Sequence, residues 1–168
     1  MNPAETKRTL ELTTPSEREI VMTRVFDAPR PLVFDAFTKP ELIRQWLLGP
    51  DGWAMPVCDV DLRVGGTFHY MWRNEADGKQ FGMNGVYREI VAPERLVHVE
   101  KFDEEWYPGE AVITTAFVEH DAATTVTMTS LYESLESRNT ALDSGMEGGV
   151  AASFDRLADI LSPPRGLS

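Results

Sequence analysis

Hydrophobic residues near the end of the chain recur at a helical spacing. They are three or four residues apart, which at about 100° per residue places them on one stripe of a helix. The residues are Leu142, Met146, Val150, Phe154, Leu157 and Leu161. Pro163 and Pro164 follow, and neither can donate the next helical hydrogen bond. The pattern therefore predicts one long helix from about Ser137 to Leu161.

The two halves of this expected helix differ in bulk. The C-terminal half presents large apolar side chains, whereas Gly145, Gly148 and Gly149 thin the N-terminal half. Each helical glycine costs about 0.5 to 1 kcal/mol relative to alanine, so three glycines in one segment need a physical reason. We expect a gap beneath this half of the helix.

Most of the remaining chain alternates apolar and polar residues with the period of a strand. Residues 18–27 form the first expected strand, and two short helices follow it at about 31–38 and 40–48. Further strands are expected at 55–64, 67–74, 80–91, 95–102, 110–119 and 124–133. Consecutive strands joined by short turns usually pair antiparallel. The sequence predicts an α+β fold, in which a curved antiparallel sheet of six to seven strands wraps around the long C-terminal helix.

Length, charge and cysteine content narrow the class of protein. The 168 residues suit one domain, expected at 17–162, with flexible tails at 1–16 and 163–168. The net charge of −11 would repel nucleic acid and anionic membranes. The polar start is neither a secretory signal nor a membrane anchor, and the lone Cys58 cannot form an internal disulfide. We expect a cytoplasmic protein.

Several short motifs occur in the order that one known group of proteins shows. They are Thr23-Arg24-Val25-Phe26-Asp27-Ala28-Pro29, Val33-Phe34-Asp35-Ala36-Phe37-Thr38, Pro40-Glu41-Leu42, Gln45-Trp46, Asp61-Leu62-Arg63-Val64-Gly65-Gly66, Gly85-Val86-Tyr87-Arg88-Glu89-Ile90, Pro93-Glu94-Arg95-Leu96-Val97, Ser144-Gly145-Met146 and Asp155-Arg156-Leu157. Over residues 18–161 the chain resembles the START-like (SRPBCC, Bet v 1-like) superfamily. Within it, the chain is similar to stand-alone relatives of the C-terminal domain of the activator of Hsp90 ATPase. The resemblance implies a helix-grip fold, often with an elongated, mostly apolar cavity between sheet and helix.

Two departures from this family pattern remove bulk. Many relatives carry a large residue, often Trp, where this chain has Gly149, and a second Trp where it has Leu47. If Gly149 lies beside the cavity, its missing side chain leaves room for a larger ligand. The co-chaperone in this group has a separate N-terminal domain, whereas this chain has only a short polar segment there. An Hsp90-type chaperone is therefore a less favoured partner.

The candidate pocket residues are mostly aromatic side chains on one face of the expected strands. Such rings give a large contact area, although filling the core is the alternative for each of them. The expected ligand-pocket residues are Trp46, Phe68, Tyr70, Trp72, Met83, Tyr87, His98, Met146, Gly149 and Val150. His98 alternates with Leu96 and Glu100 and could face the cavity as a general acid or base, or be a structural histidine. No histidine has metal-site spacing and no glycine motif suits a nucleotide, so neither a metal nor a cofactor is expected.

Three classes of function stay open at this point. The favoured hypothesis is a protein that binds a small apolar or amphipathic molecule, without obligatory chemistry. A cyclase-like or hydrolase-like enzyme is the second, and it requires two or more polar side chains to converge inside the cavity. A protein-interaction or co-chaperone module is the third, and it predicts either an exposed apolar patch or a stimulation of chaperone ATPase. The sequence does not distinguish a monomer from a homodimer.

Overall fold

The computed structural model describes residues 8–162 and has an α+β architecture. One antiparallel sheet has the order β1-β2-β8-β7-β6-β5-β4-β3. Its strands are β1 (Glu11–Thr13), β2 (Glu19–Phe26), β3 (Trp53–Val60), β4 (Thr67–Asn74), β5 (Gln80–Val91), β6 (Arg95–Phe102), β7 (Ala111–His120) and β8 (Ala123–Leu131). The helices are α2 (Arg30–Thr38), α3 (Pro40–Trp46), α4 (Leu135–Asp143) and α5 (Met146–Leu161).

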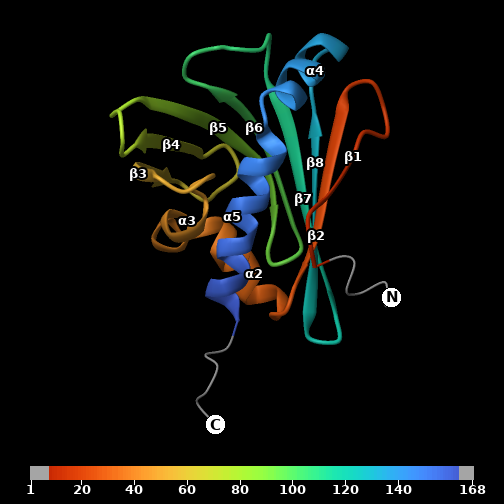
Figure 1. Ribbon diagram of the computed structural model, residues 1–168. Coiled ribbons are helices and arrows are strands. Elements are labelled where there is room, and N and C mark those ends of the chain that lie inside the picture. The colour runs from red at the N-terminus through yellow and green to blue at the C-terminus, as the bar shows by residue number, and fades with distance from the viewer. Residues whose placement is uncertain (1–7, 163–168) are drawn as a thin grey trace.

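The sheet curves around α5, which lies across its concave side (Figure 1). Strands β3 to β8 follow each other through short connections, so neighbours in sequence pair in space. Helices α2 and α3 connect β2, near one edge, to β3 at the other edge. This confirms the predicted helix-grip arrangement.

One detail of the sheet differs from the prediction. The sheet has eight strands rather than six to seven, because Glu11–Thr13 pairs antiparallel with Val21–Thr23 of β2. This short strand lies inside the segment 1–16 that the sequence suggested to be a tail; a three-residue strand is too short to show alternation. Residues 1–7 and the predicted tail at 163–168 lie outside the described residues.

The prediction of one helix over 137–161 is wrong, because the segment contains two helices. Ser134 caps α4, its side chain accepting a hydrogen bond from the backbone N–H of Ser137. Helix α4 ends at Asp143, and Gly145 adopts φ 85° before α5 begins. A side chain is disfavoured in this left-handed conformation, so the glycine suits the break. The apolar spacing continues across it, and periodicity alone therefore hides it.

The C-terminal half of α5 packs on a filled core. The Phe154 ring meets Phe26 at 5.5 Å, Trp46 at 5.9 Å and Phe37 at 6.2 Å between ring centroids. Leu157, one turn further, has no exposed surface. Aromatic contacts of this kind stabilise the fold beyond the apolar area that they bury, so this half fixes the helix on the sheet.

Hydrogen bonds also attach α5 to the loop between α3 and β3. The backbone N–H of Gly49 donates to Ser153 Oγ at 2.8 Å, and Arg156 donates to the Gly49 carbonyl at 2.8 Å. Arg156 also pairs with Asp51 at 2.9 Å. These contacts set both the position of the loop and the rotation of the helix.

Candidate functional site

A cavity of about 240 Å³ lies beneath the junction of α4 and α5, against the concave face of the sheet. It is adjacent to the filled core, because Trp46 and Phe154 contribute to both. Most of its lining is apolar or aromatic, which is typical of sites that bind small molecules. The gap predicted from the glycines is therefore present under this half of the helical segment.

Alternation along three neighbouring strands brings the aromatic lining together. Phe68, Tyr70 and Trp72 point to the concave side from β4, and their rings contact one another in sequence at 4.8 and 5.9 Å. On β5, Tyr87 lies opposite His98 of β6 in the antiparallel register. The strand pairing thus fixes which side chains meet inside the cavity.

Glu100 also faces the cavity, from the position two residues after His98 on β6. Its neighbours in the register are Gly85 on β5 and Ala111 on β7, so neither carries a large side chain beside it. A Cβ on Gly85 would approach the Phe68 ring to 2.3 Å, and the ring can lie there only because the position is glycine. The Phe68 ring therefore packs over Gly85 on one side of Glu100, and the small side chain of Ala111 lies on the other.

His98 and Glu100 form a hydrogen-bonded pair inside this cavity. The distance between His98 Nε2 and Glu100 Oε1 is 2.7 Å, and their side chains are 16% and 18% exposed. The His98 ring also meets the Phe68 ring edge-on, at 5.0 Å between centroids. Within residues 8–162 this is the only hydrogen bond to the Glu100 carboxylate, and the cavity lining contains no lysine or arginine.

Four tyrosines surround the pair and remain neutral over the physiological pH range. Burial raises the pKa of Tyr87 to about 12 and that of Tyr70 further above its usual range. Burial and the nearby Glu100 carboxylate raise the pKa of Tyr107, and they also raise that of Tyr132 to about 12. A neutral phenol both donates and accepts hydrogen bonds. The cavity thus contains one carboxylate, one imidazole and several hydroxyls in an apolar surround.

The cavity opens into a larger groove of about 890 Å³ at the break between α4 and α5. The groove is lined by the loop 47–50, the helix junction and the exposed rings of Phe81 and Trp106. Phe81 stacks on Trp72 at 5.0 Å, and the Trp72 indole N–H donates to the Leu47 carbonyl at 2.8 Å. The Trp72 contacts thus hold an apolar wall of the groove in place, and the rest of the groove also contains the carboxylates of Asp103, Glu104 and Glu105.

Nine of the ten residues expected in a pocket line the cavity. They are Trp46, Phe68, Tyr70, Trp72, Met83, Tyr87, His98, Met146 and Val150. Gly149 instead lies in the groove at the mouth, where a Cβ would meet only Pro50, at 3.8 Å. The sequence analysis did not predict Glu100, Tyr107 or Tyr132 as pocket residues. Glu100 was detectable because it shares a strand face with His98, whereas Tyr107 comes from a loop whose path no pattern reveals.

Other polar groups are engaged in structural contacts. His69 Nε2 and the Asn84 amide both bond the Asp103 carboxylate at 2.7 Å, which holds the start of the β6–β7 loop on the outer face of the sheet. His120 is largely exposed beside Asp121. Across residues 8–162, no three His, Cys, Asp or Glu side chains gather closely enough to hold a metal ion. No helix in the described chain is long and apolar enough to cross a membrane.

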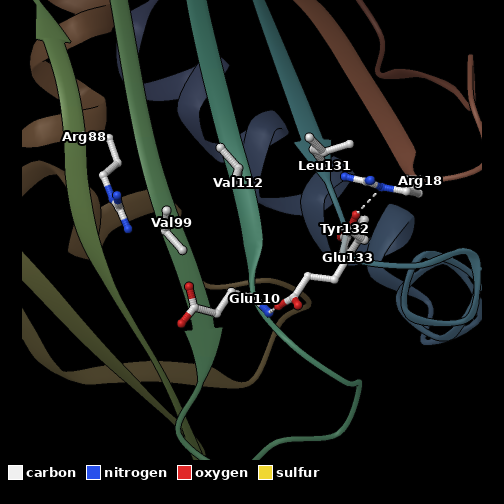
Figure 2. Close-up of a pocket in the computed structure, with 8 residues that line it drawn as sticks. All are labelled: Arg18, Arg88, Val99, Glu110, Val112, Leu131, Tyr132 and Glu133. Atoms are coloured by element: carbon white, nitrogen blue, oxygen red, sulfur yellow. Dashed lines mark hydrogen bonds between the residues drawn. The ribbon is translucent and has the colours of Figure 1, made fainter.

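A second groove, of about 400 Å³, lies on the outer face of the sheet. Figure 2 shows Arg88, Val99 and Val112 on neighbouring strands there, with Arg18 donating to the Tyr132 carbonyl at 2.9 Å. The Glu133 carboxylate accepts from the backbone N–H of Glu110 in the same view. This surface is shallow and separated from His98 and Glu100 by the thickness of the sheet.

A curved sheet that grips a helix over an internal cavity defines a START-like protein of the helix-grip class. The chain belongs to the family described as activator of Hsp90 ATPase homolog 1-like protein, whose model matches residues 27–162. Comparison with the curated proteins gives no match.

Solved structures share the fold over most of the chain. A Rhodobacter sphaeroides protein is 25% identical, with a TM-score of 0.85, and the match covers 91% of this chain and 97% of that one. A Staphylococcus epidermidis protein is 29% identical, with a TM-score of 0.75 and coverage of 88% and 92%. An AHSA1-like protein from Aeromonas hydrophila is 20% identical, with a TM-score of 0.70 and coverage of 89% and 99%, and it supports the fold alone.

Proposed function

We propose that this protein binds a small apolar or amphipathic molecule in the cavity between the sheet and the helical segment. The observation that carries the proposal is an internal, mostly apolar space whose apolar residues Met146 and Val150 also line a groove at the helix break. Side chains that filled this space would make the folded protein more stable, because the residues around a void lose packing contacts. A bound molecule would supply those contacts.

The size of the space suggests a compact ligand. The inner volume of about 240 Å³ corresponds to roughly eight water molecules in the liquid. One or two rings, or a short alkyl chain, would fill it. A longer ligand would extend past Met146 and Val150, which line both the cavity and the groove.

A neutral fluorescent dye, N-phenyl-1-naphthylamine, tests binding directly. We expect a saturable rise in fluorescence with one site per chain. Gly149→Trp places an indole in the mouth and should weaken binding at least about tenfold, which is about 1.4 kcal/mol. The matched control is Gly148→Trp, because a Cβ on Gly148 meets nothing within 4 Å.

Failure of the dye to bind the wild-type protein would refute the proposal. Native mass spectrometry and solvent extraction of the protein as purified from cells check whether a molecule already occupies the cavity in that sample. Equal dye affinity in the two tryptophan variants, with circular dichroism unchanged, would mean that the ligand does not pass Gly149.

Acid–base catalysis is a second candidate, and the His98–Glu100 hydrogen bond favours it. A carboxylate that holds one ring nitrogen leaves the other nitrogen as a base toward a bound molecule. Cyclohexanone fits the cavity and has weakly acidic C–H bonds beside its carbonyl. In D₂O, we expect exchange of these protons above the buffer rate, lost in His98→Asn. Exchange at the buffer rate would exclude this activity for ketones.

The remaining expectations stay predictions. They are one folded domain over 17–162, a cytoplasmic location, and a monomeric or homodimeric state. The family description refers to an activator of Hsp90 ATPase, and contact between this chain and such a chaperone also stays a prediction. A chaperone ATPase assay with and without the protein tests it.

A further inference from the structure

We propose that the cavity selects its ligand by headgroup: the polar end of the occupant donates a hydrogen bond to Glu100 and is an alcohol, phenol or amine rather than a carboxylate. This inference rests on the proposed binding function and specifies its chemistry. It follows from the charge of the lining, the free acceptor capacity of Glu100 and the position of the polar groups within the cavity.

The first argument is the sign of the charge. Besides the neutral tyrosines, His98 and Glu100 are the ionisable groups among the lining residues that the structure describes. Their summed charge is −1 with a neutral imidazole and zero with an imidazolium. A buried carboxylate needs a paired cation or several donors to offset its lost hydration, and this pair offers no surplus positive charge.

Arginines elsewhere in the chain do not supply that charge. Arg18 and Arg88 lie on the outer face of the sheet (Figure 2). Arg24 is buried under α5, where it pairs with Asp155 at 2.7 Å, and it does not line the cavity. An anionic headgroup would therefore meet Glu100 without compensation.

The second argument is the unused hydrogen-bonding capacity of Glu100. A carboxylate has two oxygens and about four lone-pair sites. Within the described residues only His98 bonds to it, at 2.7 Å. The Glu100 side chain lines the cavity and is 18% exposed. An O–H or N–H donor on the ligand would use that capacity in an environment where such bonds to a charged acceptor are strong.

Hydroxyls of the protein complete the polar end. The charge of Glu100 helps to raise the pKa of Tyr107 and of Tyr132. The rings of these two tyrosines meet edge-on, at 5.4 Å between centroids. A ligand hydroxyl could donate to Glu100 and accept from a tyrosine at once. An amine that is protonated at neutral pH can only donate, so only the alcohol can make both contacts.

The third argument is the order of polar and apolar residues from the cavity to the groove. With the exception of Ser153, every residue shared by the cavity and the groove is apolar: Leu47, Trp72, Met83, Phe102, Trp106, Met146 and Val150. His98, Glu100 and the four tyrosines line the cavity and not the groove. The headgroup would therefore enter first and sit deep, and the apolar part would occupy the mouth.

Three probes with the same apolar body test the inference: octan-1-ol, octylamine and octanoate, each titrated calorimetrically at neutral pH. We expect the alcohol and the amine to bind at least about tenfold more tightly than octanoate. In Glu100→Gln, which keeps the size but removes the charge, the gap between amine and octanoate should fall below about threefold. Glu110→Gln, an exposed glutamate on the outer groove, should leave all three affinities unchanged.

The outcomes separate this inference from the proposed function. Three outcomes would overturn the headgroup inference in a protein that binds N-phenyl-1-naphthylamine, and each would leave the cavity proposal standing. They are equal affinities for the three probes, tighter binding of octanoate than of the other two, and no binding of the alcohol and the amine. An unchanged amine–octanoate gap in Glu100→Gln would assign the selectivity to another group and overturn the role of Glu100. Failure of the neutral dye to bind would overturn both proposals.

Discussion

The two ends of the helix–sheet interface are built for different tasks. Toward the C-terminus of α5, Phe154 and Leu157 are almost completely buried in a core that contains Phe26, Trp46 and Phe117. Toward the N-terminus, Met146 and Val150 are only partly buried over a cavity. The same sheet and the same helical segment thus hold a filled core at one end and an accessible space at the other.

This difference separates stability from recognition along one element. Large apolar side chains at the closed end stabilise the fold and fix the rotation of α5 through burial. At the open end, the His98 and Glu100 side chains bond each other and keep further hydrogen-bonding capacity for a ligand. A protein that concentrates packing at one end can keep a partly exposed acceptor such as Glu100 at the other without losing its structure.

The largest expected effect is the loss of packing at the closed end. Phe154→Ala should reduce the free energy of unfolding by about 3 to 5 kcal/mol, because the cavity it leaves is surrounded by rings that cannot collapse into it. Met146→Ala at the open end should cost about 1 kcal/mol or less, since it enlarges a space that already exists. Urea unfolding followed by circular dichroism measures both.

Dye binding gives the opposite ranking. Met146→Ala should change the affinity for N-phenyl-1-naphthylamine, whereas folded Leu157→Ala, at a core residue that does not line the cavity, should bind it within about threefold of wild type. Similar stability losses in Phe154→Ala and Met146→Ala would contradict the division of the interface into a closed and an open end.

The second effect concerns alkaline pH, which should act on the open end alone. The pKa of Tyr87 rises from 10.0 to about 12 on folding because burial penalises its charged form. A raised folded pKa favours the protonated state in the native protein, so the stability it contributes is complete below pH 10 and is lost as the pH rises toward 12. A shift of two units corresponds to at most about 2.7 kcal/mol. The phenylalanines and tryptophan around Phe154 do not titrate.

Denaturant titrations at several pH values between 9 and 12 test this point. At neutral pH, Tyr87→Phe should lower the free energy of unfolding by about 1 kcal/mol, because the hydroxyl is missing. Between pH 9 and 12 the free energy of unfolding of this variant should then fall by about 2 kcal/mol less than that of the wild type. His120→Gln, at an exposed site that does not line the cavity, should follow the wild-type curve. Parallel curves for Tyr87→Phe and wild type would contradict burial as the cause.

Sequence patterns predicted the closed end better than the open one. The apolar stripe through Phe154 and Leu157 gave the helix and its buried face, because burial on both partners leaves a periodic signal. The aromatic strand face that includes Tyr70 and Trp72 was identified for the same reason. These features depend on local periodicity, which a single sequence records.

The open end depends on features without a period. The break at Gly145 is one backbone angle, and the approach of Tyr107 to Glu100 depends on the path of a loop. Gly149 was expected beside the cavity, but the rotation of α5 places it in the groove. That rotation is set by contacts of Ser153 and Arg156 with Gly49 more than 100 residues earlier in the chain, which periodicity cannot reveal.

The smallest effect distinguishes the three glycines of the open end by sign. Gly148→Ala should stabilise the protein by about 0.5 to 1 kcal/mol, because an added Cβ meets nothing within 4 Å and the unfolded chain loses conformational freedom. Gly149→Ala should do the same, since its Cβ would make an ordinary contact with Pro50 at 3.8 Å. Gly145→Ala should instead destabilise by about 1 kcal/mol, because alanine is strained at φ 85°. Thermal unfolding of the three variants measures these differences. If all three were stabilising, α4 and α5 would join as one continuous helix in solution, and the mouth of the cavity would lose the break that forms it.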